Sequence, residues 1–293
     1  MIIVTLVATL AAAMVWQQWR AVQVEAAERS RAQSAWILSG ALDFAKLILK
    51  ETVRPGDPTT LSGEWATPLA ESRLSTFLAV DKSNVDDGPE AFLSGNISDA
   101  QARYNLKNLV SDGNVDKDQR AALERLCLSV GIDSGVADRI ATGLRDATLG
   151  TSATAPLMPT SVAQLTWLGV EQASVNALQP YVVLLPGITP VNVNTAPKEV
   201  LAAVFDLDPA TAEHLVQMRQ RTPFKDTASF TTQLTKPAPA AKFDVRSSYF
   251  DVLGRLRLVD RVLVERSLLQ RLPNGQAKVW QRERVSSLEQ VGG

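Results

Sequence analysis

The side chains that could act as nucleophiles, bases or metal ligands are few and scattered. Among 293 residues the chain has one cysteine, Cys127, and one histidine, His214. This pair cannot supply the three or four nitrogen and sulfur ligands of a zinc site, and a lone cysteine cannot form an intrachain disulfide. A Ser-His-Asp or Cys-His arrangement would need His214, which lies in the middle of a helical pattern, where a structural role is more common. We therefore expect no enzymatic activity and no small-molecule substrate.

A calcium loop is the next candidate, because Asp112–Asp118 has oxygen-bearing side chains at alternate positions. An EF-hand loop would need a glycine where Lys117 stands and a closing glutamate where Leu123 stands. A turn followed by a helix cap at Asp116 is the better interpretation. The sequence predicts no cofactor, and calcium stays an alternative.

A helix-hairpin-helix is the third candidate. Asn194–Pro197 is typical of a helix start with a side-chain cap, and a second helical pattern covers Pro209–Gln220. In DNA-binding examples a glycine-rich hairpin offers its N–H groups to a phosphate, whereas Asp206 and Asp208 would repel one. No basic stripe accompanies the motif either. We expect no binding to nucleic acid, and a membrane-tethered helix-hairpin-helix DNA-binding protein stays the alternative function.

The composition points to a folded protein without an obligatory charged partner. Apolar residues make up 45% of the chain and charged residues 21%, with 30 basic against 31 acidic groups. The length suffices for two domains of roughly 100–200 residues each.

The N-terminal segment predicts a membrane anchor over residues 1–19. Its first sixteen residues carry no charge and no helix breaker. As a helix they reach about 24 Å, a little short of the roughly 30 Å hydrocarbon core of a bilayer. Trp16, Trp19 and Arg20 suit the membrane–water interface at its end.

The helical pattern then continues to residue 52, with Gly40 as its one interruption. A helix of about fifty residues is near 75 Å long, so one small domain cannot cover all of it. Lipid or other subunits must cover its first half.

The remainder predicts an α+β fold. Strands are expected at Ser72–Val80, Glu90–Ile97, Ser248–Leu258, Val262–Gln270 and Gln276–Arg284. Helices are expected after the Asp116 cap and over 133–146, 161–168 and 171–178. We predict a long N-terminal helix, 1–52, that packs on an antiparallel sheet domain, 53–110 and 241–293. A large all-helical domain, 111–240, is inserted in that sheet domain.

Two sequence runs carry a family resemblance. Ser98–Leu109 is similar to a D-A-x-x-R-F-N-L-N-N-L run, and Val191–Ala203 is similar to an N-V-N-T-A-x-x-x-V-L-A-A run. Both occur in the K-type minor pseudopilins of the type II secretion system, which are related to type IV pilins. With the anchor and the C-terminal strands, the resemblance covers nearly the whole chain.

The resemblance implies a structural protein at the tip of the pseudopilus that initiates its assembly for protein export. It further implies the I- and J-type minor pseudopilins as partners, with the H-type a further candidate. It places a single-pass anchor in the bacterial inner membrane and most of the chain in the periplasm. A prepilin peptidase would leave Met1, or a residue it replaces, as a methylated mature N-terminus. The family's calcium-binding acidic stretch is absent, since only Asp146 stands at that place.

Thr5 fits that role, because most pseudopilins carry a glutamate there to neutralise the N-terminus of the subunit above. A tip subunit has no such neighbour, and an unpaired glutamate in lipid would cost several kcal/mol. We expect the anchor and assembly residues to be Met1, Ile2, Ile3, Thr5, Leu6, Trp16, Trp19, Ala27 and Ala35. Ala27 and Ala35 belong to a stretch of small residues that would allow partner helices to approach closely.

Overall fold

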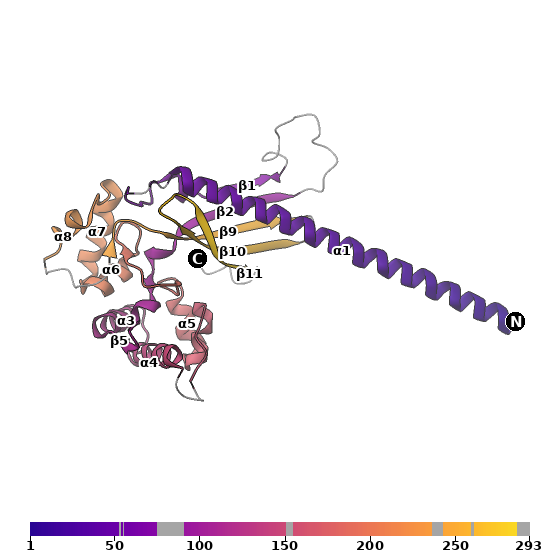
Figure 1. Ribbon diagram of the computed structural model, residues 1–293, viewed down its shortest axis with the longest axis horizontal. Helices are drawn as coiled ribbons and strands as arrows, with labels where there is room; N and C mark the ends of the chain where they lie inside the picture. The colour runs from indigo at the N-terminus through magenta and orange to yellow at the C-terminus, as the bar shows by residue number, and fades with distance from the viewer. Residues whose placement is uncertain are drawn as a thin grey trace.

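The computed structural model describes residues 1–52, 54, 56–74, 91–150, 155–235, 243–258 and 261–285. It contains one long helix, a five-stranded antiparallel sheet and a group of shorter helices (Figure 1). The α+β fold class predicted from the sequence is confirmed. The helices are α1 Ile2–Thr52, η1 Glu64–Ala66, η2 Ala100–Ala102, η3 Leu106–Leu109, α3 Lys117–Ser129, α4 Gly135–Leu149, η4 Val162–Leu168, α5 Gln172–Leu178, α6 Lys198–Phe205, α7 Pro209–Arg221 and α8 Thr227–Thr231. The strands are β1 Leu69–Arg73, β2 Phe92–Asp99, β3 Tyr104–Asn105, β4 Val110–Ser111, β5 Asn114–Val115, β6 Val182–Val183, β7 Val191–Asn192, β8 Phe243–Asp244, β9 Tyr249–Arg257, β10 Val262–Arg271 and β11 Ala277–Val285.

The long helix α1 behaves differently along its two halves. From residue 34 onward it buries one residue per turn, namely Ser34, Leu38, Leu42, Ala45 and Leu49. This spacing of three or four residues places those side chains on one face of the helix. Residues 1–26 are all exposed. Only the second half of α1 therefore belongs to the folded domain.

The five-stranded sheet joins parts of the chain that are far apart in sequence. Its strand order is β1-β2-β9-β10-β11, and every neighbouring pair is antiparallel. Strand β2 precedes the helical region and pairs along its whole length with β9, which follows it. Phe250 and Leu269 lie on the face that α1 covers, and Trp65 packs edge-on against Phe250 with ring centroids 5.3 Å apart. The sheet is thus the frame to which both other parts attach.

The predicted C-terminal meander is confirmed as β9, β10 and β11, with Gly275 at a positive φ of 78° in the last turn. Of the predicted strand Ser72–Val80, the first two residues fall at the end of β1, and residues 75–80 lie outside the described residues. The division of the chain at residues 53, 111 and 241 stays a prediction.

The helical region lies beyond one end of the sheet, at the opposite end of the molecule from the N-terminus (Figure 1). Its core includes Leu123, Leu126, Ile140 and Leu201, each fully buried. The region is not purely helical, because the two-residue strands β6 and β7 pair in parallel with β3 and β8. The segment 161–168 forms a 3-10 helix. These short pairings hold the helical region to the segments that flank it.

Candidate assembly interface

The first half of α1 is an apolar surface without a covering. Ile2 is 82% exposed and Leu6 57%. In the described part of the chain, α1 is the one helix long and apolar enough to cross a membrane, and none of that apolar window is buried. Apolar area on this scale needs lipid or another protein around it.

The predicted anchor residues all lie on this bare half. Thr5 donates its hydroxyl to the carbonyl oxygen of Ile2 at 2.8 Å, so it needs no partner from outside its own helix. Trp16 and Trp19 are exposed, and the Arg20 guanidinium lies 4.8 Å from the ring centre of Trp16. Two rings and a cation at one level suit the boundary between lipid and water.

Beyond the anchor, α1 carries charges that pair along the helix. Glu25 accepts a hydrogen bond from Arg29 at 2.7 Å, and Glu28 accepts one from Arg31 at 3.0 Å. Ala27 and Ala35 are half-buried by their surroundings. They are eight residues apart, which is about 80° around the helix axis, so they probe two different faces.

A buried carboxylate lies where the sheet meets the helical region. Asp99, at the end of β2, accepts hydrogen bonds from the hydroxyls of Thr195 and Ser247, both at 2.6 Å. It also accepts from the Asn192 side chain at 3.0 Å and from the Gln101 backbone N–H at 2.8 Å. Burial raises the pKa of Asp99, although all four hydrogen bonds act to lower it. This carboxylate joins three segments that are remote in sequence.

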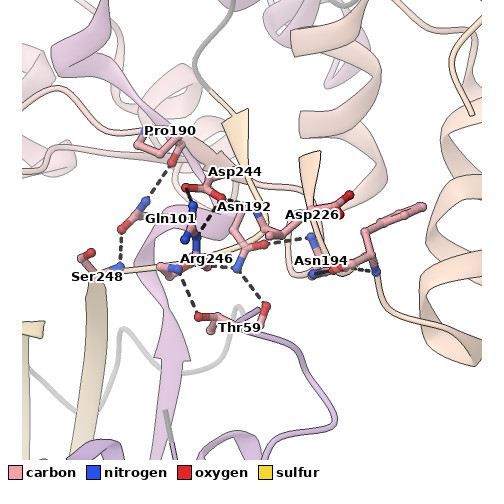
Figure 2. Close-up of polar contacts among 12 residues, drawn as sticks. Thr59, Gln101, Pro190, Asn192, Asn194, Asp226, Asp244, Arg246 and Ser248 are labelled. Atoms are coloured by element: carbon pink, nitrogen blue, oxygen red, sulfur yellow. Dashed lines mark hydrogen bonds and ion pairs between the residues drawn. The ribbon is translucent and has the colours of Figure 1, made fainter. Parts of the chain in front are cut away.

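Asn192 and Gln101 extend this contact, which we call the polar joint: Thr59, Asp99, Gln101, Asn192, Thr195 and Ser247. Figure 2 shows the Asn192 amide directed at the Thr59 backbone, which it reaches at 3.0 Å. The Gln101 side chain bridges the Pro190 carbonyl at 2.9 Å and the Ser248 N–H at 2.6 Å. The polar joint thus ties the sheet to the start of the β7–α6 segment.

Two further asparagines act as substitutes for a peptide group. The Asn108 side chain binds both the carbonyl and the N–H of Thr189, at 2.8 and 3.1 Å. The Asn194 side chain binds the carbonyl and N–H of Phe224, both at 2.9 Å. The predicted side-chain cap at Asn194 is therefore wrong, because α6 begins at Lys198 after Pro197 with no side-chain cap. The competing backbone partner at Phe224 takes the Asn194 amide instead.

Arg219 and Cys127 are both buried and have structural roles. Arg219 of α7 is 6% exposed and donates to the Val193 carbonyl at 2.6 Å, and burial lowers its pKa to about 10. Cys127 is fully buried, and burial raises its pKa to about 11. A protonated buried thiol is a poor nucleophile. The sequence indicated these segments only through the family resemblance. It did not indicate which of their polar side chains are buried.

The two acidic residues of the hairpin between α6 and α7 interact with other groups of the same chain. Asp206 adopts a left-handed φ of 52° and lies 3.8 Å from Arg125. Asp208 caps α7 by accepting from the N–H groups of Ala210 and Thr211, both at 3.0 Å. The hydroxyl and N–H of Thr211 lower the pKa of Asp208, so it stays charged. The hairpin presents negative charge where a DNA phosphate would need donors.

The predicted turn and cap at Asp112–Asp118 is observed. Asp112 forms the tight turn between β4 and β5, and Asp116 caps α3 by accepting from the N–H groups of Asp118 and Gln119. Asp146 pairs with Arg145 at 2.7 Å. Within the described ranges no three His, Cys, Asp or Glu side chains are placed to hold a metal ion. These residues do not fit a calcium site, and the expectation of no cofactor stays a prediction.

Comparisons with known proteins agree on one family. Residues 102–187 and 191–252 match domain families described as type II secretion system, protein K. The type II secretion system protein K of Pseudomonas aeruginosa is 30% identical, over 97% of this chain and 90% of that protein. A chain from the crystal structure of the GspK-GspI-GspJ complex of enterotoxigenic Escherichia coli shares the fold. Its TM-score is 0.69 at 19% identity, over 89% of this chain and 99% of that one.

Proposed function

Because the chain belongs to the protein K family of the type II secretion system, we propose that it forms the tip of the pseudopilus and initiates its assembly. The observation that carries this proposal is the placement of the two ends. The bare apolar half of α1 extends from one end of the sheet, and the helical region lies beyond the other (Figure 1). A bulky region at the end away from the helix leaves no room for another subunit to stack there, which suits a terminal position.

Thr5 supports the same position. A pseudopilin inside a fibre uses an acid near its N-terminus to neutralise the subunit above. Thr5 carries no charge, and its hydroxyl is satisfied by its own helix. A buried, unpaired carboxylate at that place would be costly in an apolar environment. A terminal subunit avoids that cost.

We propose the I- and J-type minor pseudopilins as direct partners, with the H-type a further candidate. The Escherichia coli relative was crystallised as a complex of GspK with GspI and GspJ. We place the anchor, residues 1–19, in inner-membrane lipid and the rest of the chain in the periplasm. Charged pairs such as Glu25–Arg29 begin directly after the anchor and favour water over lipid.

The role is structural and not enzymatic, without a nucleic-acid partner or a small-molecule substrate. The candidate groups support this: Cys127 is buried, His214 is exposed on the outside of α7, and the hairpin acids disfavour DNA.

The test is co-purification of the full chain, in detergent, with the I- and J-type subunits of its own secretion system. Ala27→Trp and Ala35→Trp add bulk on two faces of α1 and should abolish the association while the chain stays folded. Lys50→Trp, at the exposed end of the same helix, is the matched control and should associate normally. Unchanged association of both alanine variants would overturn the assignment of this stretch as the assembly seam.

A further inference from the structure

An apolar groove of about 510 Å³ runs beside the second half of α1. One wall is the helix, with Ile37, Ala41 and Ile48, and the other is the sheet, with Leu69 and Leu93. Helix α1 packs mainly over β9 and β10, so the described residues leave the face of β1 and β2 beside it open. The groove therefore follows from where α1 crosses the sheet.

Three glycines from separate elements line the groove. Gly95 of β2 and Gly254 of β9 are directly paired across the sheet, and Gly40 of α1 lies on the helix wall. A Cβ at Gly95 would come within 2.5 Å of the Leu253 carbonyl oxygen, so a side chain cannot replace this hydrogen without a backbone shift. A Cβ at Gly40 would meet nothing within 4 Å. At Gly40 the helix therefore leaves open the space that a side chain would usually fill.

The two flanks of α1 differ in chemistry at the same spacing. The flank that lines the groove carries Ile37, Ala41, Phe44 and Ile48. The opposite flank, outside the groove, carries Ser39, Asp43, Lys46 and Lys50. Each set follows intervals of four, three and four residues, which is one line along a helix. If the groove faced only water, apolar side chains would not be needed on the flank of α1 that lines it.

The groove also has an exposed apolar rim. Trp36 is 76% exposed, Phe44 48% and Leu47 51%, and with Gly40 they form a stripe along α1. The stripe lies on the same helix as the bare first half, beyond the charged pairs Glu25–Arg29 and Glu28–Arg31. Glu265 is the one charged residue that lines the described part of the groove, and it is ion-paired with Arg282. None of the described lining residues therefore offers an unpaired charge to a polar ligand.

We propose that this groove receives an apolar helix of a neighbouring subunit, which runs beside α1 and continues the contact made along its bare half. The inference rests on the proposed function, because it names the surface on which an I- or J-type partner would dock. A helix fits since Gly40 allows close approach of two backbones, and side chains at helical spacing can enter the groove beside Gly95. The rim aromatics would then be covered at the contact.

The first test is Gly40→Leu in the full chain. Its side chain enters open space, and leucine favours a helix interior over glycine, so the chain should fold at least as stably as the original. We expect the amount of I- and J-type subunit that co-purifies in detergent to fall at least ten-fold. Asp43→Leu, on the polar flank, adds a similar side chain outside the groove and should leave association unchanged. Normal association of the Gly40→Leu variant would overturn the proposal.

The second test measures coverage directly. Cys127 is fully buried, so maleimide should label a Gly40→Cys variant at the new thiol alone. Labelling should be fast in the free chain and at least ten-fold slower in the complex, while an Asp43→Cys variant keeps its rate. Slow labelling of the free chain would place detergent or lipid in the groove and overturn the proposal, as would an unchanged rate in the complex.

The outcomes separate the two proposals. Loss of association in the Ala27→Trp or Ala35→Trp variant, with normal association of Gly40→Leu, would remove the groove inference and keep the proposed function. Normal association in all three would remove the groove inference and the assignment of the Ala27–Ala35 stretch as the assembly seam, whereas failure of the unsubstituted chain to co-purify with these subunits would contradict the proposed function.

Discussion

Two joints hold this molecule together, and they use opposite chemistry. At the first, which we call the apolar joint, α1 packs on the sheet through Leu42, Ala45 and Leu49 against Phe250 and Val252. Such packing has no fixed direction, and its strength follows the apolar area removed from water. Side chains of suitable size at helical spacing are enough to form it.

The polar joint attaches the helical region to the end of the same sheet. Asp99 receives donors from Thr195 and Ser247, and Asn192 links it to the backbone at Thr59. Each donor needs its own acceptor at about 3 Å, so the contact specifies one relative orientation. Helix α1 is therefore held by a contact that tolerates changes in side-chain shape, and the helical region by one that requires specific donors and acceptors.

Breaking the polar joint should give the largest effect. Asn192→Ala leaves the Asp99 carboxylate, the Thr59 carbonyl and the Asn194 N–H each short of a buried partner. We expect a loss of about 3–5 kcal/mol in the free energy of unfolding, measured by urea denaturation. Asn176→Ala, at an exposed site on α5, is the control and should stay within about 0.5 kcal/mol. A loss below about 1 kcal/mol for Asn192→Ala would show that the polar joint is not demanding.

The apolar joint should respond to the loss of a buried side chain. Leu49 is fully buried, so Leu49→Ala should lower the free energy of unfolding by about 2–5 kcal/mol. The same substitution at Leu10, which is 54% exposed on the bare half of α1, should cost less than about 0.5 kcal/mol in detergent. Equal losses at both positions would mean that the two halves of α1 do not differ as the burial pattern indicates.

The two joints also differ in how far sequence could predict them. The apolar joint can be predicted from the sequence, because Leu42, Ala45 and Leu49 recur at helical spacing. The polar joint cannot, since hydrogen bonds between Asp99 and Thr195 depend on segments that meet only in the folded chain. The local rule for helix caps predicted the wrong role for Asn194, whose amide binds Phe224 thirty residues away.

The groove could not be predicted from the sequence either, because it is formed by residues that are remote from one another along the chain. Gly40 was visible as an interruption in a helix, but its meaning depends on Gly95 and Gly254. Those two pair across strands that are separated by the whole helical region. Periodicity reports which face of an element is apolar and does not report what lies opposite.

The pH dependence of stability should distinguish the two joints, because only the polar joint contains a buried group that titrates. The pKa of Asp99 is raised in the folded chain, so the folded state keeps this proton to a higher pH than the unfolded state does. Stability should therefore fall as the pH rises from about 4, the unfolded value, through the raised folded pKa. Asp99→Asn replaces the titrating carboxyl group by an amide that does not titrate. The stability lost on substitution should therefore be larger at pH 4 than at pH 7. The loss for Leu49→Ala should be the same at both, and a pH-independent loss for Asp99→Asn would contradict the assignment.

The smallest effect is expected from the largest deletion. Removal of residues 1–19 takes away the predicted anchor but no residue of either joint, since burial on α1 begins at Ser34. The shortened chain should stay in solution without detergent and unfold within about 0.5 kcal/mol of the full chain in detergent. Removal of residues 1–40 is the matched control, because it also removes the buried Ser34 and Leu38 and should destabilise the domain. Aggregation of the shorter deletion, or equal stability of both, would show that the boundary between bare and docked helix lies elsewhere than at Ser34.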